Sequence, residues 1–204
     1  MNLGKKSAED CYKSISTPSK GLYKDKGSKF LSFAFPVENE DEAKAIISSI
    51  KKEYFDARHH CWAWRLGHLG DKWRFNDDGE PSSTAGKPIY GQILSNELSD
   101  ILIVVVRYFG GTLLGTSGLI TAYKTASADA IANAQIIEKT ATVRYKVEFD
   151  YLQMNAVMKC LKDFQLTPQN TVYENVCSLE VDVRLAMETA FVESIQKICI
   201  CQRV

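Results

Sequence analysis

The chain reads Asn76-Asp-Asp-Gly-Glu-Pro-Ser-Ser-Thr-Ala-Gly-Lys-Pro88 and, after an apolar run, Arg107-Tyr-Phe-Gly-Gly-Thr-Leu-Leu-Gly115. The apolar run, Ile101-Leu-Ile-Val-Val-Val106, is continuous and rich in β-branched residues, which predicts a central strand covered on both faces. Two polar, glycine-rich segments therefore flank the apolar part of the chain, and a helix is expected directly after the second. Because loops on a rigid scaffold often carry binding and chemistry, these segments are the candidate site.

Upstream of this stretch, hydrophobic periodicity predicts further elements. Residues 29–37 alternate as a half-buried strand. Four acids within residues 38–42 suit the start of a helix, and the apolar positions of residues 43–54 recur at helical spacing. Residues 60–66 and 72–76 predict a hairpin around a glycine-containing turn.

Two features predict the helix after the second glycine-rich segment, a candidate N-cap residue and a row of inward-facing side chains. Thr116 or Ser117 is a candidate N-cap. Its inner face is expected to carry mostly small side chains that allow close packing on a sheet. These residues are Leu119, Ala122, Tyr123, Ala126, Ala130 and Ala134.

A new pattern begins near residue 141 and predicts a second domain. The order of elements is β-α-β-β-α-β, the split arrangement of ferredoxin-like domains. The expected helix 152–164 turns Leu152, Ala156, Val157 and Cys160 inward, among others. The fold class is thus α+β, with domains at residues 1–137 and 138–204. The second domain is expected to contain strand 142–151, helix 152–164, the hairpin 171–173 and 176–185, helix 186–197 and strand 198–204.

Composition limits the classes of function. The chain has 204 residues, enough for one large domain or two small ones, and 25 basic residues balance 25 acidic ones. A zero net charge argues against broad phosphate neutralisation, although a local basic patch remains open. Residues 1–29 carry seven lysines against three acids. That excess predicts either a solvated end or a contact with an acidic partner.

The chain is expected to be cytoplasmic, with no membrane partner. Its first residues lack an apolar stretch of signal-peptide length, and the longest aliphatic run is too short to span a bilayer. The six cysteines are then expected to be reduced, and most simply buried as small apolar residues. A metal or disulfide role is the alternative.

The second glycine-rich segment is close to the phosphate-binding pattern G-x-x-x-x-G-K-[ST] but has Thr116 in place of the lysine. Nucleotide hydrolysis is therefore not expected. Two interpretations remain for Gly110, Gly111 and Gly115. Their backbone N–H groups and the helix N-terminus favour an anion, or the glycines simply make a tight turn.

The first segment concentrates three carboxylates, Asp77, Asp78 and Glu80. They could stabilise the loop, contact a ligand or partner, or hold Mg²⁺. Ser82 and Thr84 offer hydroxyls to an extended polar partner, and no G-x-S-x-G motif makes either a nucleophile.

Arg107, at the end of the apolar strand, is followed by Tyr108 and Phe109. An arginine with an aromatic neighbour could hold a phosphate and stack on a base. Alternatively, Arg107 forms an ion pair with Asp77 or Asp78 that pins the two loops. A metal site at the nearby pair His59 and His60 is not expected, because adjacent strand residues point to opposite faces.

These motifs resemble the Impact/YigZ family over roughly residues 15–135. The shared pattern comprises His60-Cys-x-Ala63, the segments quoted above, and Gly118-Leu with Ala122-Tyr123. Residues 140–204 look like the small C-terminal domain of bacterial members. The sequence departs from the family pattern at Ser83, Ser117 and Thr121, where the last loses an arginine that many members carry.

The resemblance implies a first domain like domain 2 of ribosomal protein S5, a sheet with helices on one face. It also implies a ferredoxin-like second domain similar to the last domain of translocase elongation factors. Eukaryotic members regulate translation during amino-acid starvation through protein contacts, using an additional N-terminal domain. Fold likeness alone does not transfer that function.

The family resemblance and the two candidate loops together lead us to expect a non-catalytic regulatory or binding protein of translation. It would contact RNA or ribosome-bound factors. The alternatives are a magnesium-dependent enzyme on a phosphorylated small molecule and a protein-interaction module. No cofactor, metal or catalytic residue is expected. The binding residues are expected to be Asp77, Asp78, Glu80, Ser82, Thr84, Lys87, Arg107, Tyr108, Gly110, Gly111 and Gly115.

Overall fold

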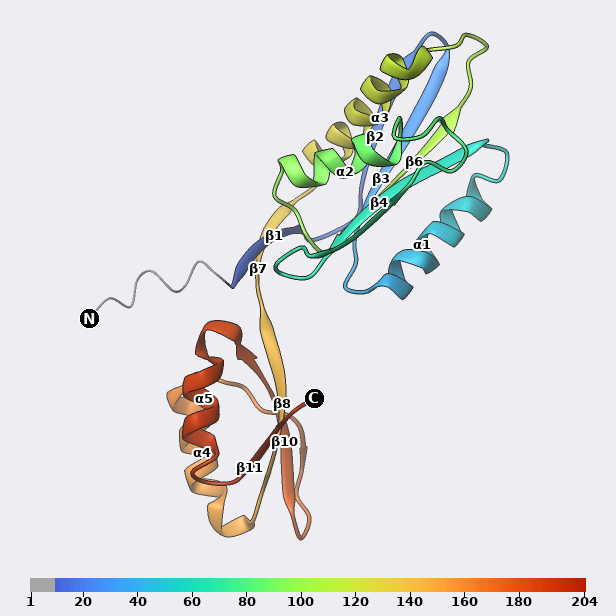
Figure 1. Cartoon of the computed structure of the whole chain (residues 1–204). Helices are drawn as coiled ribbons and strands as arrows, with labels where there is room; N and C mark the ends of the chain where they lie inside the picture. The colour runs from blue at the N-terminus through green and yellow to red at the C-terminus, as the bar shows by residue number, and fades with distance from the viewer. Residues whose placement is uncertain (1–9) are drawn as a thin grey trace, which may run out of the picture. The chain divides into compact units, whose positions relative to one another are not determined.

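The computed structural model describes residues 10–204 (Figure 1). Their contacts divide the chain into two compact units, Tyr12–Lys139 and Thr140–Val204, the latter joined by residues 10 and 11. The first lysines of the lysine-rich N-terminal segment lie outside the described range. Within that range, no helix is both long and apolar enough to cross a membrane.

The larger unit is built on a five-stranded antiparallel sheet, which includes the predicted central strand and hairpin. Each residue of β6 from Ile101 to Arg107 is buried, as expected for a strand covered on both faces. In spatial order the strands are β2 (Ser19–Asp25), β3 (Ser28–Pro36), β6 (Ile101–Tyr108), β4 (His59–Leu66) and β5 (Lys72–Asn76).

Helices cover both faces of this sheet, which corrects the expectation of helices on one face (Figure 1). On one face, α2 (Gly86–Ser95) and α3 (Gly115–Ala132) pack over Ile103 and Val105. On the other, α1 (Glu40–Glu53) packs over Val104. The reason lies in β6, whose alternate side chains are apolar in both directions and need cover on both sides.

The strand β3 shows the same correction. It was expected to be half-buried, but Phe30 and Ala34 are buried against α3 while Phe33 is buried towards α1. The helix α1 itself has the predicted apolar stripe. Its Asn39 cap accepts hydrogen bonds from the backbone N–H groups of Asp41 and Glu42.

The boundary between the units falls inside a short two-stranded sheet that the sequence did not predict. Its strands are β1 (Cys11–Ile15) and β7 (Ile136–Thr140). The backbone N–H of Ser16 donates to the carbonyl of Gln135 over 3.0 Å. The exact division after residue 137 and the likeness to elongation factors stay predictions.

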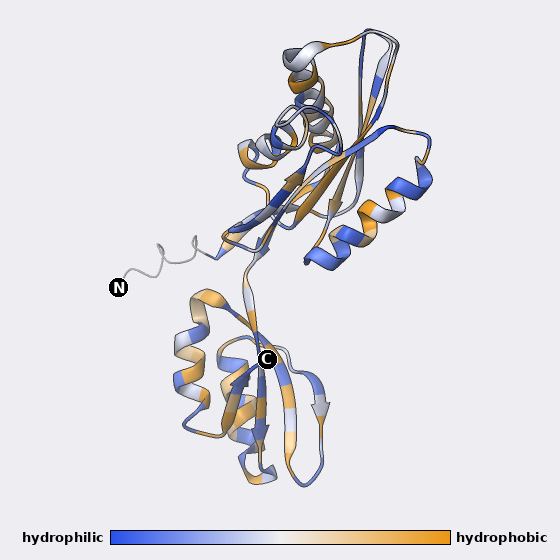
Figure 2. Ribbon diagram, turned by 45° about the vertical axis from the view of Figure 1, so that its right-hand side comes forward, coloured by the Kyte–Doolittle hydropathy of each residue, from blue (hydrophilic) through white to orange (hydrophobic). Residues whose placement is uncertain are grey.

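The smaller unit has a four-stranded antiparallel sheet in the order β11-β8-β10-β9, covered by α4 and α5. Buried and open positions alternate along β8 and β10, and apolar and polar colours alternate in Figure 2, as expected for a sheet with one covered face. The predicted β-α-β-β-α-β order is confirmed. The elements are β8 (Thr142–Phe149), α4 (Met154–Asp163), β9 (Gln169–Val172), β10 (Cys177–Arg184), α5 (Glu188–Ile195) and β11 (Ile200–Arg203).

Two inward-facing predictions in this unit are wrong. Leu152 is 96% exposed, and Ala156 is also exposed. The chain first makes a 3₁₀ turn at Tyr151–Gln153, and α4 begins only at Met154. Leu152 therefore lies outside the helix, whereas Val157 and Cys160 are buried as predicted.

Candidate functional site

Two loops of the larger unit meet beside the sheet. We call residues 77–85, between β5 and α2, the acidic loop, and residues 109–114, between β6 and α3, the glycine loop. They enclose a pocket of about 410 Å³, the loop pocket. Its lining comprises Arg58, His59, Glu80, Pro81, Arg107, Phe109, Leu113, Leu114, Gly115, Thr116 and Leu119.

A buried ion pair in the lining of this pocket joins the acidic loop to the end of β6. Arg107 Nη1 donates to Glu80 Oε1 over 2.6 Å, and the two side chains are only 7% and 3% exposed. The Tyr123 hydroxyl of α3 donates to the same oxygen over 2.8 Å. The alternative that Arg107 pairs with Asp77 or Asp78 is therefore wrong, because Glu80 takes that place.

The Arg107 guanidinium is also packed between aromatic rings. Its central carbon lies 5.5 Å from the ring centre of Phe30 and 5.7 Å from that of Phe109, within the range of cation–π attraction. Its Nε is buried and has no hydrogen-bond partner among the residues that the structure describes. Arg107 is thus a rigidly held cation with an unused donor.

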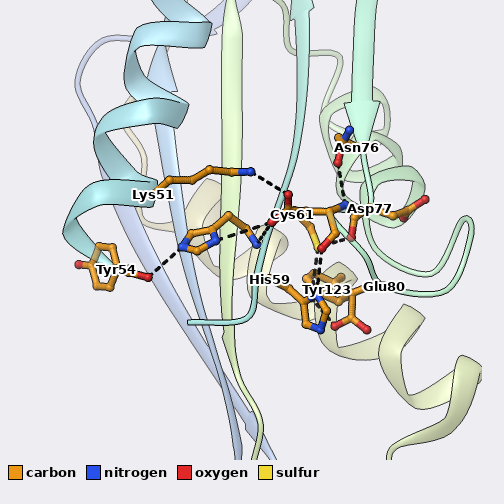
Figure 3. A network of polar contacts seen from close by, with 10 residues as sticks. Lys51, Tyr54, His59, Cys61, Asn76, Asp77, Glu80 and Tyr123 are labelled. Atoms are coloured by element: carbon orange, nitrogen blue, oxygen red, sulfur yellow. Dashed lines mark hydrogen bonds and ion pairs between the residues drawn. The ribbon is translucent and has the colours of Figure 1, made fainter. Parts of the chain in front are cut away.

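The polar network continues from Glu80 through Tyr123 to Cys61 (Figure 3). The Cys61 sulfur lies 3.3 Å from the Tyr123 hydroxyl and 3.0 Å from the Asp77 carbonyl oxygen. Burial raises the pKa of the Tyr123 hydroxyl and the pKa of the Cys61 thiol. Both groups therefore stay neutral around pH 7, and the Tyr123 hydroxyl remains a hydrogen-bond donor to Glu80.

Asp77 stabilises the acidic loop and the start of α2. Its carboxylate accepts hydrogen bonds from the backbone N–H groups of Ser83, Ala85 and Gly86, at 2.9, 3.0 and 2.8 Å. These include N–H groups at the helix start that have no partner within the helix. The negative charge also suits the positive end of the helix dipole. Asp77 thus has a structural role in this geometry.

Asp78 connects the acidic loop to α1 and β4. It accepts from Lys51 Nζ and from the backbone N–H of His60, each over 2.7 Å. Burial by itself would raise the pKa of the Asp78 carboxyl. The hydrogen bonds and charges of Lys51 and His60 outweigh burial and hold that pKa below its usual value of 3.8.

This lowered pKa makes a pH-dependent prediction. Ionised Asp78 should stabilise the fold above about pH 3.8, and the stabilisation should vanish as pH falls through the lower folded-state pKa. Asp78→Asn should therefore unfold more easily than the parent near pH 6, and the gap should shrink as the pH falls below 3.8. Urea unfolding followed by tryptophan fluorescence measures this gap, since all three tryptophans lie in the larger unit. A gap that is constant with pH would contradict the role assigned to Asp78.

Four other predicted site residues do not line the loop pocket. Thr84 is buried, and its hydroxyl donates to the Pro81 carbonyl over 2.7 Å. Ser82 is exposed on the acidic loop, and Lys87 is exposed in the first turn of α2. Tyr108 packs with the α1 side of the sheet, and its hydrogen bond to the Asp56 carboxylate raises the pKa of Tyr108 to about 12.

The three predicted glycines allow the backbone conformation in and next to the glycine loop. A Cβ atom on Gly110 would lie 1.9 Å from the carbonyl carbon of Gly27, so only glycine allows this approach of two backbones. Gly111 and Gly115 have φ angles of 89° and 73°, in the left-handed region. The tight turn is therefore real, and anion binding by these backbone groups stays a prediction. Of the three, only Gly115 lines the loop pocket.

The three carboxylates of the acidic loop do not converge. Asp77 faces the N-terminus of α2, Asp78 faces Lys51 and His60, and Glu80 faces Arg107. Within residues 10–204, no group of three or more His, Cys, Asp or Glu side chains is arranged to hold a metal ion.

Several pocket residues were not among the predicted binding residues, namely Arg58, His59, Phe109 and Leu113. Phe109 carried a signal, because it follows Arg107 and Tyr108 in the quoted segment, and alternation directs Tyr108 to the opposite face of the sheet from Arg107. Arg58 carried none, since it lies in an ordinary turn before β4.

Comparison with known proteins places this geometry in context. The family model of the Impact N-terminal domain matches residues 26–131. The chain is 35% identical to the IMPACT family member YigZ of Escherichia coli, over 81% of this chain and 82% of that one. It is 38% identical to an IMPACT family member of Haemophilus influenzae, over 69% of each. A Saccharomyces cerevisiae Protein IMPACT homolog is 31% identical over 45% of this chain and 36% of its own.

A solved structure supports the fold over nearly the whole chain. This crystal structure of a hypothetical protein is 30% identical, with a TM-score of 0.72, and the match covers 96% of this chain and 97% of that one. The resemblance inferred from the sequence motifs and the α+β fold class are therefore both confirmed.

Proposed function

Since the chain belongs to the IMPACT family, we propose that it is a non-catalytic regulatory protein of translation that contacts RNA through its two loops. The observation that carries the proposal is Arg107, a buried cation fixed by Glu80 in the lining of the loop pocket, with Nε left unpaired. The family resemblance adds support, because it implies a role of eukaryotic members in translation. Both domain types that the resemblance implies also recur in proteins that contact RNA or the ribosome.

Charge favours an anionic partner at this position. The loop pocket is lined by two arginines and one glutamate, and the N-terminus of α3 opens onto it at Gly115 and Thr116. Arginine and helix N-termini are the common protein donors to phosphate. A local site of this kind agrees with a chain whose net charge is zero.

A magnesium-dependent enzyme is less well supported. Its carboxylates would need to converge on one ion, whereas Asp77, Asp78 and Glu80 each serve a different set of donors. Mg²⁺ binding at the acidic loop would require at least one of these structural bonds to break.

A protein-interaction module is the second candidate, and one surface feature favours it. Trp73 on the edge strand β5 is 50% exposed and stacks on Tyr90, with ring centres 4.9 Å apart, and on Phe75 at 5.9 Å. Exposed aromatic clusters are frequent in protein interfaces. This cluster lies outside the loop pocket, so the two candidates involve different residues.

Capture of RNA from cell lysate tests the proposal. Tagged protein should retain ribosomal or transfer RNA, and ribonuclease treatment should release it. Arg58→Ala, which removes an exposed cation of the loop pocket, should reduce the retained RNA about tenfold, whereas Arg74→Ala, an exposed arginine outside the pocket, should not. Proteins retained equally after ribonuclease and in high salt would favour the interaction module instead, because phosphate contacts weaken steeply with salt.

A further inference from the structure

The N-terminus of α3 differs in its capping from those of α1 and α2. Asn39 accepts from the first turn of α1, and Asp77 accepts from the start of α2. The N-cap position of α3 is Leu114, which has no polar side chain, so the predicted capping by Thr116 or Ser117 is wrong. An uncapped helix start carries free N–H donors and partial positive charge, and here it faces the loop pocket.

Arg107 is an independent indication of a ligand at the same place. It is only 6% exposed, it lines the loop pocket, and its Nε lacks a hydrogen-bond partner among residues 10–204. Buried polar groups are normally satisfied, and an exception calls for an explanation such as a missing ligand. Glu80 balances the charge of Arg107 in their ion pair, so the remaining positive charge among the arginines and the glutamate of the lining comes from Arg58.

The loop pocket is also lined by apolar side chains, one of which is aromatic. Phe109 is 48% exposed although Arg107 holds its ring in a cation–π contact, so the ring keeps surface for a planar partner. Leu113 is 82% exposed on the same glycine loop, and Pro81 faces the pocket from the acidic loop. A phosphate alone would gain nothing from these side chains, whereas a nucleobase stacks on such a surface.

The size of the loop pocket fits a single base together with its phosphate. A volume of about 410 Å³ lies in the lower part of the range typical of small-molecule sites. In a base-paired duplex the faces of the bases are covered by the neighbouring pairs. Only an unpaired nucleotide can therefore offer a base face to Phe109.

From these observations we propose that the loop pocket binds one unpaired nucleotide. Its base stacks on Phe109 and packs against Leu113, and its phosphate is held by Arg58 and the N-terminus of α3. The inference deepens the proposed function and rests on it, since it names the part of the RNA that the loops hold. The same chemistry could come from a nucleotide within single-stranded RNA or from a free nucleoside monophosphate.

Titration of the full chain with adenosine 5′-monophosphate, adenosine, inorganic phosphate and a single-stranded RNA hexamer tests this inference. The monophosphate should bind saturably, and adenosine and phosphate should each bind at least about tenfold more weakly. Phe109→Ala and Arg58→Ala should each weaken the monophosphate about tenfold. Phe55→Ala and Arg74→Ala are the matched controls, because both side chains are exposed outside the loop pocket, and they should change nothing.

The possible outcomes separate this inference from the proposed function. If the hexamer binds but the monophosphate neither binds nor competes, and Phe109→Ala leaves RNA affinity unchanged, the nucleotide site is refuted while RNA binding stands. If the monophosphate binds and the hexamer does not, the site is a free-nucleotide site and the proposed function fails. If neither binds, or if an acidic peptide binds in place of both, the inference is wrong.

Discussion

Replacing Arg107 by alanine should destabilise the larger unit by about 3–5 kcal/mol, the usual cost of leaving one member of a buried ion pair without its partner. The Glu80 side chain is 3% exposed and would keep only the hydrogen bond from Tyr123. The loss is one of folding as well as of binding, because the arginine is a core residue as well as a pocket residue.

Urea unfolding followed by tryptophan fluorescence measures this loss in the larger unit alone. The control is the double variant Arg107→Met and Glu80→Leu, which removes both charges and keeps apolar volume. It should be clearly more stable than Arg107→Ala, since no carboxylate is stranded. A single variant within about 1 kcal/mol of the parent, or a double variant as unstable as the single one, would contradict the assignment.

Gly110→Ala should destabilise the larger unit by roughly 3 kcal/mol and displace the glycine loop. The added Cβ would lie 1.9 Å from the Gly27 carbonyl carbon and 2.1 Å from the Ser28 backbone nitrogen, so one backbone must move. The movement would also break the hydrogen bond from the Gly110 N–H to Ser28 Oγ, which is 3.1 Å long. Ligand binding in the loop pocket should weaken in parallel, because Phe109 and Leu113 belong to the same loop.

Gly111→Ala is the matched comparison for this prediction. Gly111 has a positive φ of 89°, but no atom of another part of residues 10–204 lies within 4 Å of the Cβ position. The substitution should therefore cost only the strain of a left-handed conformation, about 1–2 kcal/mol. If Gly110→Ala proved no more harmful than Gly111→Ala in urea unfolding, close backbone approach would not be the reason for glycine at position 110.

Most strands and helices could be predicted because their apolar residues recur at one clear period. The missed helix α2 shows where this fails. Gly86, Pro88 and Gly91 all lower helix propensity, so the segment looked like loop. It is helical because Asp77, from a preceding loop, accepts hydrogen bonds at its start and because its apolar side is buried in the core. Both causes depend on tertiary contacts, which the periodicity of the sequence does not show.

The candidate site was predictable to a similar degree. The two loops were identified and do meet, and the burial of Arg107 could have been inferred, since it follows Ile103 and Val105 on one face of β6. The identity of its ion-pair partner, Glu80, could not be inferred. The acidic loop turns through positive φ values of 43° at Asp78 and 62° at Ser83, and sequence does not reveal that this path directs Glu80 inward.

The most direct test of the account is the affinity of the purified full chain for a fluorescein-labelled single-stranded RNA, measured by fluorescence anisotropy at low and high salt. The parent should bind saturably and lose affinity as salt rises. The double variant Arg58→Ala and Phe109→Ala should bind about a hundredfold more weakly while unfolding in urea like the parent. A parent that does not bind RNA, or a double variant that binds it as tightly as the parent, would contradict the claim that the loop pocket holds RNA.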